Sequence, residues 1–78
     1  MKTIEKKILP EYFDAVIRGV KNFELRKDED DAEPEDVLLL KEWNGKTFTG
    51  RETGRMIQYV LRDAPEYGLM PGFCILGW

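Results

Sequence analysis

The sequence predicts an α+β fold that is mainly β: a small, partly open β-barrel of five to six strands with one N-terminal helix at about residues 10–18. Three observations predict it. Only PEYFDAVIRGV has apolar residues at helical spacing, whereas the other apolar segments are short and bounded by turn residues. Asn44-Gly45 is a strong hairpin signal. So many strands in 78 residues must curl around a core, because a flat sheet would expose its edges. We expect a single domain spanning residues 1–78.

The N-terminal third of the chain predicts a strand, a helix and a second strand. Residues 3–9 (TIEKKIL) form the first strand. Pro10 suits the first turn of the helix, and Gly19 can adopt the left-handed conformation that ends it. The helix has apolar residues at positions 12, 13, 16, 17 and 20. We expect the i, i+4 pair Phe13 and Ile17, or else Tyr12 and Val16, to pack against the barrel.

The second strand is formed by residues 22–27 (NFELRK), and the remaining strands come after it. The acidic segment 28–36 is predicted to be a flexible, solvated loop with almost no apolar anchor. Residues 36–43 form a third strand, and its run of apolar residues 37–40 suggests burial on both faces. A type I′ turn at Asn44-Gly45 leads to residues 46–50 and then to a long strand over 51–63, with a bulge at Gly54. Residues 73–78 form the last strand.

Composition excludes several kinds of chemistry. The chain has no histidine, no serine and one cysteine. It therefore lacks the residues for a Ser-His or Cys-His catalytic pair and for a Cys/His zinc site. We expect no metal and no cofactor. The lone Cys74 forms no internal disulfide, which is typical of a reducing compartment. There is no long apolar run and no apolar signal segment, so we expect a cytoplasmic protein without a membrane partner.

The charge is unevenly distributed. The formal net charge is −3, but residues 28–36 hold seven of the fifteen acidic residues. The rest of the chain has twelve basic and eight acidic residues, a net charge of +4. Affinity for phosphate depends on local charge, so the net value does not exclude a nucleotide ligand.

The segment GVKNFELRK, residues 19–27, holds the main candidate site. Strand alternation places Glu24 and Arg26 on one face, and the long side chain of Lys21 can reach the same rim. One interpretation is a solvated strand face whose charges prevent aggregation. The other is a ligand site at the mouth of the barrel. There Lys21 and Arg26 would hold a phosphate or a base edge while Glu24 accepts a hydrogen bond from an amino group.

Arg55 is the second candidate. It shares a predicted strand face with Ile57, Tyr59 and Leu61, which we expect to point inward. An inward arginine needs a partner, which can be Glu24, Glu42 or a ligand. We expect Arg55 to converge with Lys21, Glu24 and Arg26 on one solvent-accessible cleft.

These residues carry a resemblance. The pattern G-x-K-x-x-E-x-R, formed by Gly19, Lys21, Glu24 and Arg26, resembles the signature of the ASCH domains, relatives of the PUA domain. The ordered segments LLLKEWNGKTFTGRE, YVLRD and PGFCILGW are similar to a small bacterial and phage branch of that superfamily. The resemblance implies a PUA-like barrel with a cleft lined by the motif.

Two functions follow from the resemblance, and a third interpretation is an interaction protein whose charged cluster is only a structural network. The first is a binding module for RNA, a nucleotide or a nucleoside that uses Lys21, Glu24, Arg26 and Arg55. The second is a small hydrolase, of the amidohydrolase or ribonuclease type, acting on a modified nucleoside or RNA. In such an enzyme Lys21 would be the base and Glu24 the proton donor. Glu24 stands where the amidohydrolase branch has a threonine, and the acidic loop also departs from that branch.

Overall fold

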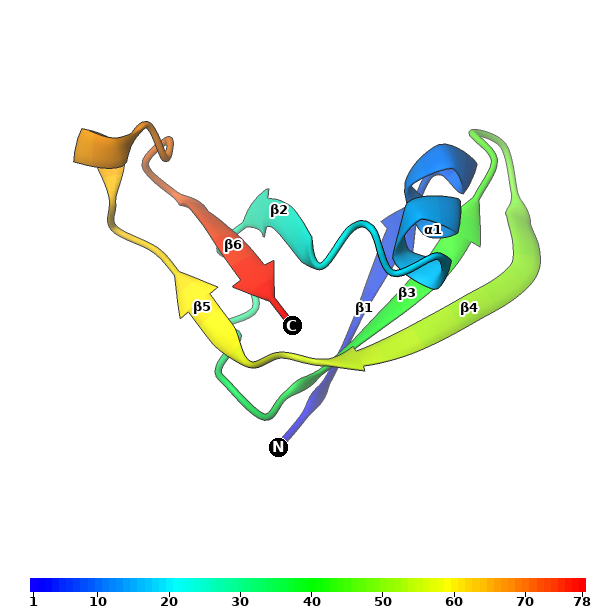
Figure 1. Cartoon of the computed structure of the whole chain (residues 1–78), viewed down its shortest axis with the longest axis horizontal. Helices are drawn as coiled ribbons and strands as arrows, with labels where there is room; N and C mark the ends of the chain where they lie inside the picture. Colours follow the sequence, from blue (N-terminus) through cyan, green and yellow to red (C-terminus); the bar gives the residue numbers. More distant parts are fainter.

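A computed structural model describes all residues 1–78 and contains six strands, one α-helix and one short 3₁₀-helix (Figure 1). The predicted α+β, mainly β class is confirmed. The elements are β1 (Thr3–Ile8), α1 (Pro10–Ile17), β2 (Phe23–Lys27), β3 (Val37–Trp43), β4 (Phe48–Met56), β5 (Tyr59–Leu61), η1 (Pro65–Tyr67) and β6 (Phe73–Gly77). Neither helix has the length and apolar character needed to cross a membrane.

The strands form two three-stranded sheets and no closed barrel. The first sheet has the order β1-β3-β4, and the second has the order β2-β6-β5. In the first sheet β1 runs parallel to β3, and β4 pairs with β3 as a hairpin. The second sheet is antiparallel throughout. Figure 1 shows α1 beside β1 and β3, with β4 leading out of the first sheet toward β5 in the second.

The predicted long strand over 51–63 is broken at Ile57 and Gln58, where the chain passes between sheets. The backbone N–H of Ile57 donates to the Asp36 carbonyl at 2.8 Å, and that of Gln58 donates to the Gly77 carbonyl at 2.8 Å. Within two residues, the hydrogen-bonding partner of the backbone thus changes from the β3 side of the first sheet to β6 of the second sheet. The break reverses the side-chain alternation, so Ile57 is fully buried while Tyr59 is 66% exposed. The expectation that Tyr59 points inward is therefore wrong.

The hydrophobic core lies between α1 and the inner faces of both sheets. Its buried residues are Ile4, Ile8, Phe13, Val16, Ala32, Leu38, Leu40, Ile57, Cys74 and Leu76. From the helix, Phe13 and Val16 are buried, whereas Tyr12 and Ile17 are about half exposed. The buried pair therefore has i, i+3 spacing, and neither predicted i, i+4 pair packs as a unit. A helix of eight residues presents only a narrow stripe to the core.

Gly19 ends α1 in the manner that the sequence predicts. Its φ of +78° is left-handed. The N–H of Gly19 donates to the Val16 carbonyl, and the N–H of Val20 donates to the Ala15 carbonyl, both at 3.0 Å. This pair of bonds is a Schellman motif. Lys21 N–H also donates to Ala15, so the helix end fixes the backbone on which the Lys21 side chain stands.

The hairpin between β3 and β4 is confirmed, but its details differ from the prediction. Gly45 has a φ of +98°, whereas Asn44 does not have the positive φ that a type I′ turn requires. Instead, the Asn44 side chain accepts hydrogen bonds from the N–H groups of Lys46 and Thr47. Gly54 pairs regularly with Leu39, so the predicted bulge there is wrong; the irregularity lies between Lys41 and Trp43.

Replacing Gly19 by alanine is expected to lower the free energy of unfolding by about 1–2 kcal/mol, because an L-residue is strained at this φ. No atom lies within 4 Å of the added Cβ, so the cost is conformational. Gly54→Ala is the matched control: its Cβ meets only Val37 Cγ1, at an ordinary 3.7 Å, and its φ is not left-handed. We expect that variant to be neutral or slightly stabilising. Urea melts of both variants test this, and equal losses would contradict it.

Candidate functional site

A pocket of about 500 Å³ lies between the facing edges of the two sheets. The end of β1, the start of α1 and the edge strand β2 form its walls, so we call it the β1–β2 pocket. It is lined by Lys7, Ile8, Leu9, Tyr12, Lys21, Phe23, Glu24, Leu25 and Arg26. Its volume lies within the range of small-ligand sites.

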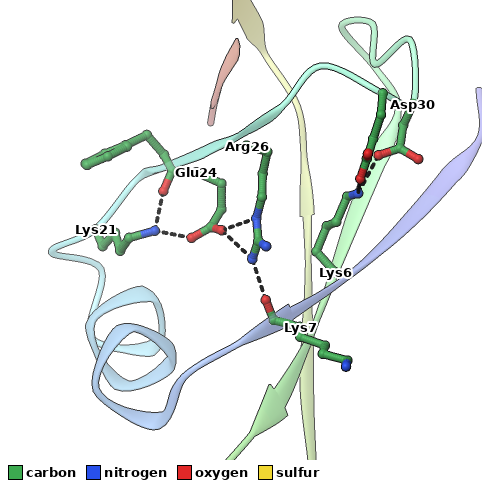
Figure 2. A network of polar contacts seen from close by, with 8 residues as sticks. Lys6, Lys7, Lys21, Glu24, Arg26 and Asp30 are labelled. Atoms are coloured by element: carbon green, nitrogen blue, oxygen red, sulfur yellow. Dashed lines mark hydrogen bonds and ion pairs between the residues drawn. The ribbon is translucent and has the colours of Figure 1, made fainter. Parts of the chain in front are cut away.

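Three of the four predicted site residues meet in this pocket. Lys21 Nζ pairs with Glu24 Oε1 and donates to the Phe23 carbonyl at 2.6 Å. Arg26 Nε donates to Glu24 Oε2 at 2.9 Å, and Arg26 Nη2 lies 2.8 Å from the same oxygen. Arg26 Nη2 also donates to the Lys7 carbonyl. Figure 2 shows the two cations on either side of the Glu24 carboxylate.

Strand β2 buries its charged side chains more deeply than its apolar ones. Glu24 is only 5% exposed and pairs in register with the buried Leu76 of β6. On the opposite face, Phe23 is 48% and Leu25 is 55% exposed. Burying a carboxylate is costly unless it is paired, whereas burying Phe23 and Leu25 would be favourable. The arrangement is therefore unlike the solvated charged face considered as the alternative, and it marks β2 as a candidate functional strand.

Arg55 does not line the β1–β2 pocket, which corrects the expected convergence of four residues. Its guanidinium donates to Thr53 Oγ1 at 2.6 Å, to the Gly54 carbonyl at 2.8 Å and to the Val16 carbonyl at 3.4 Å. Arg55 therefore contacts the C-terminal end of α1 rather than the pocket. The prediction assumed that the partly open barrel brings the strand of Arg55 next to that of Glu24, whereas β4 and β2 belong to different sheets.

Two aromatic residues of the pocket were missed by the sequence analysis. Lys21 Nζ lies 5.0 Å from the centre of the Phe23 ring and 6.0 Å from that of Tyr12. Both side chains are about half exposed. Tyr12 was considered only as a packing residue and Phe23 was given no role, although the exposed side of an amphipathic helix beside a Lys-x-Phe sequence could have indicated an aromatic wall.

The acidic loop, residues 28–36, forms ion pairs with basic residues from other parts of the chain. Asp36 accepts hydrogen bonds from Lys2 Nζ at 2.8 Å and from the Lys2 and Glu33 N–H groups at 2.9 Å each. Lys6 pairs with Asp30, and Arg62 Nε pairs with Asp28 at 2.7 Å. Ala32 is buried in the core and gives the loop, which was expected to have almost no apolar anchor, one small anchor. Three basic side chains, Lys2, Lys6 and Arg62, thus pair with five of the seven acidic residues of this loop. No group of three or more His, Cys, Asp or Glu residues is placed to hold a metal ion.

A second buried carboxylate links α1 to the first sheet. Glu42 is 3% exposed and accepts hydrogen bonds from Arg51 Nε at 2.9 Å and from Thr49 Oγ1 at 2.5 Å. Arg51 Nη2 also contacts Asp14 of α1 at 3.1 Å, and its guanidinium lies 4.7 Å from the centre of the Phe13 ring. Glu42 was one of the partners predicted for Arg55, but in the structure it pairs with Arg51. The network joins three elements, and none of its residues lines the β1–β2 pocket.

These networks predict a loss of stability in acid. The hydrogen bond from the Lys2 ammonium, followed by those from backbone N–H groups, holds the pKa of Asp36 well below its ordinary value. Hydrogen bonds from Arg51 and then Thr49 lower the pKa of Glu42. A carboxyl group with a lowered pKa in the folded state stabilises that state above its unfolded pKa. Stability should therefore fall as the pH drops below about 4.

Urea melts across this pH range test the prediction, with Asp36→Asn as the key variant. The variant should be less stable than the wild type at neutral pH, and its stability should depend less on pH in acid. Asp63→Asn, an exposed residue that forms no ion pair, is the control and should retain the wild-type dependence. Parallel curves for wild type and Asp36→Asn would contradict the assignment.

The amino-acid sequence is similar to a known domain family and to a phage protein. Residues 3–78 match the family described as a domain of unknown function, DUF3850. The chain belongs to the DUF3850 family. This DUF3850 chain is also similar to the "Uncharacterized 12.9 kDa protein in GpA 3'region" of Escherichia phage P2, with 43% identity over 59 residues. The aligned region covers 76% of this chain and 54% of the phage protein, so the chain spans about half the length of that relative.

Proposed function

We propose that this DUF3850 domain is a binding module for RNA or a nucleotide, and that the ligand occupies the β1–β2 pocket. One observation carries the proposal. The buried carboxylate of Glu24 is flanked by the cations of Lys21 and Arg26, while the apolar neighbours of Glu24 on β2 are about half exposed. These charged residues line a pocket of about 500 Å³ that also has aromatic side chains in its wall. A chain that needed only stability would not bury Glu24 while exposing Phe23 and Leu25.

The pocket offers the groups that a nucleotide requires. Arg26 and Lys21 can donate to a phosphate or to a base carbonyl. Glu24 Oε1 accepts from Lys21 alone, so it retains a lone pair for an amino group of a base. Tyr12 and Phe23 supply ring faces for stacking, which is tolerant of base identity.

The resemblance to ASCH domains supports the same proposal, because those relatives are suspected of binding RNA or nucleotides. We further propose that the two sheets correspond to the halves of the partly open, PUA-like barrel that the resemblance implies. The pocket then lies at the opening between β1 and β2.

The hydrolase alternative has less support. As a base, Lys21 would have to accept a proton through Nζ. That nitrogen instead donates to the Phe23 carbonyl and pairs with Glu24, which suits an ammonium group used as a donor. We therefore favour binding over catalysis.

Thermal-shift measurements with a panel of nucleosides, nucleotides and short RNAs test the proposal. A ligand present at 100 times its dissociation constant should stabilise the domain by about 2.7 kcal/mol. Arg26→Ala should abolish that shift. Arg55→Ala is the matched control, because it removes an arginine that lies outside the pocket. If no compound stabilises the wild type, or if Arg55→Ala loses the shift as fully as Arg26→Ala, the proposal is wrong.

A further inference from the structure

Two aromatic rings and two lysines gather on the outer face of the first sheet, beside the β3–β4 hairpin. The Trp43 and Phe48 rings meet edge to face, with centres 5.0 Å apart and planes at 70°. Lys7 Nζ lies 4.2 Å from the centre of the Trp43 ring, and Lys41 Nζ lies 5.2 Å from that of Phe48. We call these four residues the lysine–aromatic cluster.

The pairing of the strands places the cluster on one face. Lys7 of β1 is the register partner of Lys41 of β3, and Trp43 of β3 pairs with Phe48 of β4. Lys41 and Trp43 lie two residues apart, so their side chains share the face opposite the buried Glu42. The Phe48 side chain is 45% exposed. The cluster thus presents two aromatic rings beside two neighbouring lysines.

Both lysines of the cluster lack an acidic partner. Lys2, Lys6 and Lys21 each form an ion pair, but neither Lys7 nor Lys41 does. Glu52 is the register neighbour of Lys41 on β4, yet no ion pair joins them. Glu5 and Glu52 lie on the same face of the sheet, but no ion pair engages the ammonium group of Lys7 or Lys41, so both ammonium groups can donate to an anion.

The cluster adjoins the β1–β2 pocket through Lys7. The Lys7 carbonyl accepts a hydrogen bond from Arg26 at the pocket, while its side chain extends toward Trp43. Figure 2 shows the Lys7 carbonyl directed at Arg26 and the side chain directed away from the network. Only the edge of β1 therefore separates the two sites.

We propose that the lysine–aromatic cluster is a second subsite, which binds the neighbouring nucleotide of a single-stranded nucleic acid held in the β1–β2 pocket. This inference rests on the proposed function. Phe48 offers a ring for a base to stack on, and Lys7 and Lys41 hold the adjoining phosphates. The Trp43 ring packs edge to face against the Phe48 ring and so helps to fix its position. The physiological ligand is then an oligonucleotide rather than a mononucleotide.

The test compares the affinities of a mononucleotide and of single-stranded oligonucleotides of increasing length. We expect affinity to rise from the mononucleotide to the dinucleotide and beyond. Phe48→Ala should weaken oligonucleotide binding about tenfold, the effect of losing one stacked base, and leave mononucleotide binding unchanged. Lys41→Ala should reduce the slope of log affinity against log salt by about 0.7, the value for one phosphate of a single strand. Met56→Ala, a half-exposed apolar residue of β4 outside the cluster, is the control and should change neither affinity.

The outcomes separate this inference from the proposed function. If the mononucleotide binds but oligonucleotides bind no more tightly, or if Phe48→Ala and Lys41→Ala leave oligonucleotide binding intact, the second subsite is overturned and the pocket proposal stands. If oligonucleotides bind through Phe48 while Arg26→Ala has no effect, the pocket proposal fails instead. If neither ligand binds the wild type, both are overturned. Phe48→Leu, which keeps an apolar side chain without the ring, distinguishes lost stacking from lost folding and should reproduce the defect of Phe48→Ala.

Discussion

Removing both cations that flank Glu24 is expected to destabilise the protein far more than removing either one. Lys21→Ala and Arg26→Ala should each lower the free energy of unfolding by about 1 kcal/mol, because the carboxylate keeps its other partner. The double variant leaves a charge with 6% side-chain exposure and no cation, and should lose roughly 3–5 kcal/mol. Urea melts of the four proteins of this double-mutant cycle provide the measurement.

A third substitution shows whether the unpaired charge is the cause. Adding Glu24→Gln to the double variant removes the charge and should restore much of the lost stability. If the two single losses add up to that of the double variant, the Glu24 carboxylate is solvated through the pocket and the network contributes little. Under the proposed function, each single variant would still lose ligand binding, because each removes a donor from the pocket while the fold remains stable.

The elements that could be predicted from the sequence are those determined by local chemistry. Pro10 and Gly19 bound α1 as expected, because fixed and left-handed backbone conformations depend on the residue itself. The hairpin at Asn44-Gly45 and the apolar strands were predictable for the same reason. The motif residues Lys21, Glu24 and Arg26 met as expected, because strand alternation and a short sequence separation bring them together.

The errors concern long-range arrangement. The break of the strand at Ile57 depends on Asp36 and Gly77, which are distant in the sequence and which no local pattern links to it. The misplacement of Arg55 follows from the same cause, since its position depends on how β4 lies relative to β2. The pairing of Lys2 with Asp36 was equally invisible, and for that reason the acidic loop was expected to be solvated throughout.

A related error concerns β3, and it leads to the second large prediction. The continuous run Val37–Leu40 suggested burial on both faces, but the structure buries Leu38 and Leu40 completely and leaves Val37 and Leu39 partly exposed. The outer face of the first sheet has no layer packed on it, because α1 and the second sheet both lie on the inner side. The apolar run therefore overstates the burial of this strand.

Leu38→Ala should consequently lower the free energy of unfolding by about 2–5 kcal/mol, since it opens a cavity in a fully buried part of the core. A small domain has a total stability of only about 5–15 kcal/mol, so this one variant should lose a large fraction of it. Leu39→Ala is a matched control, because it removes the same atoms from the next residue of β3 on the opposite face. It should cost less, about 1–2 kcal/mol, because the Leu39 side chain is only partly buried and leaves no enclosed cavity. Thermal and urea unfolding of both variants decide the matter. Equal losses would mean that the outer face of β3 is covered by a layer, as the sequence pattern suggested, and would contradict the open outer face on which the second nucleotide subsite depends.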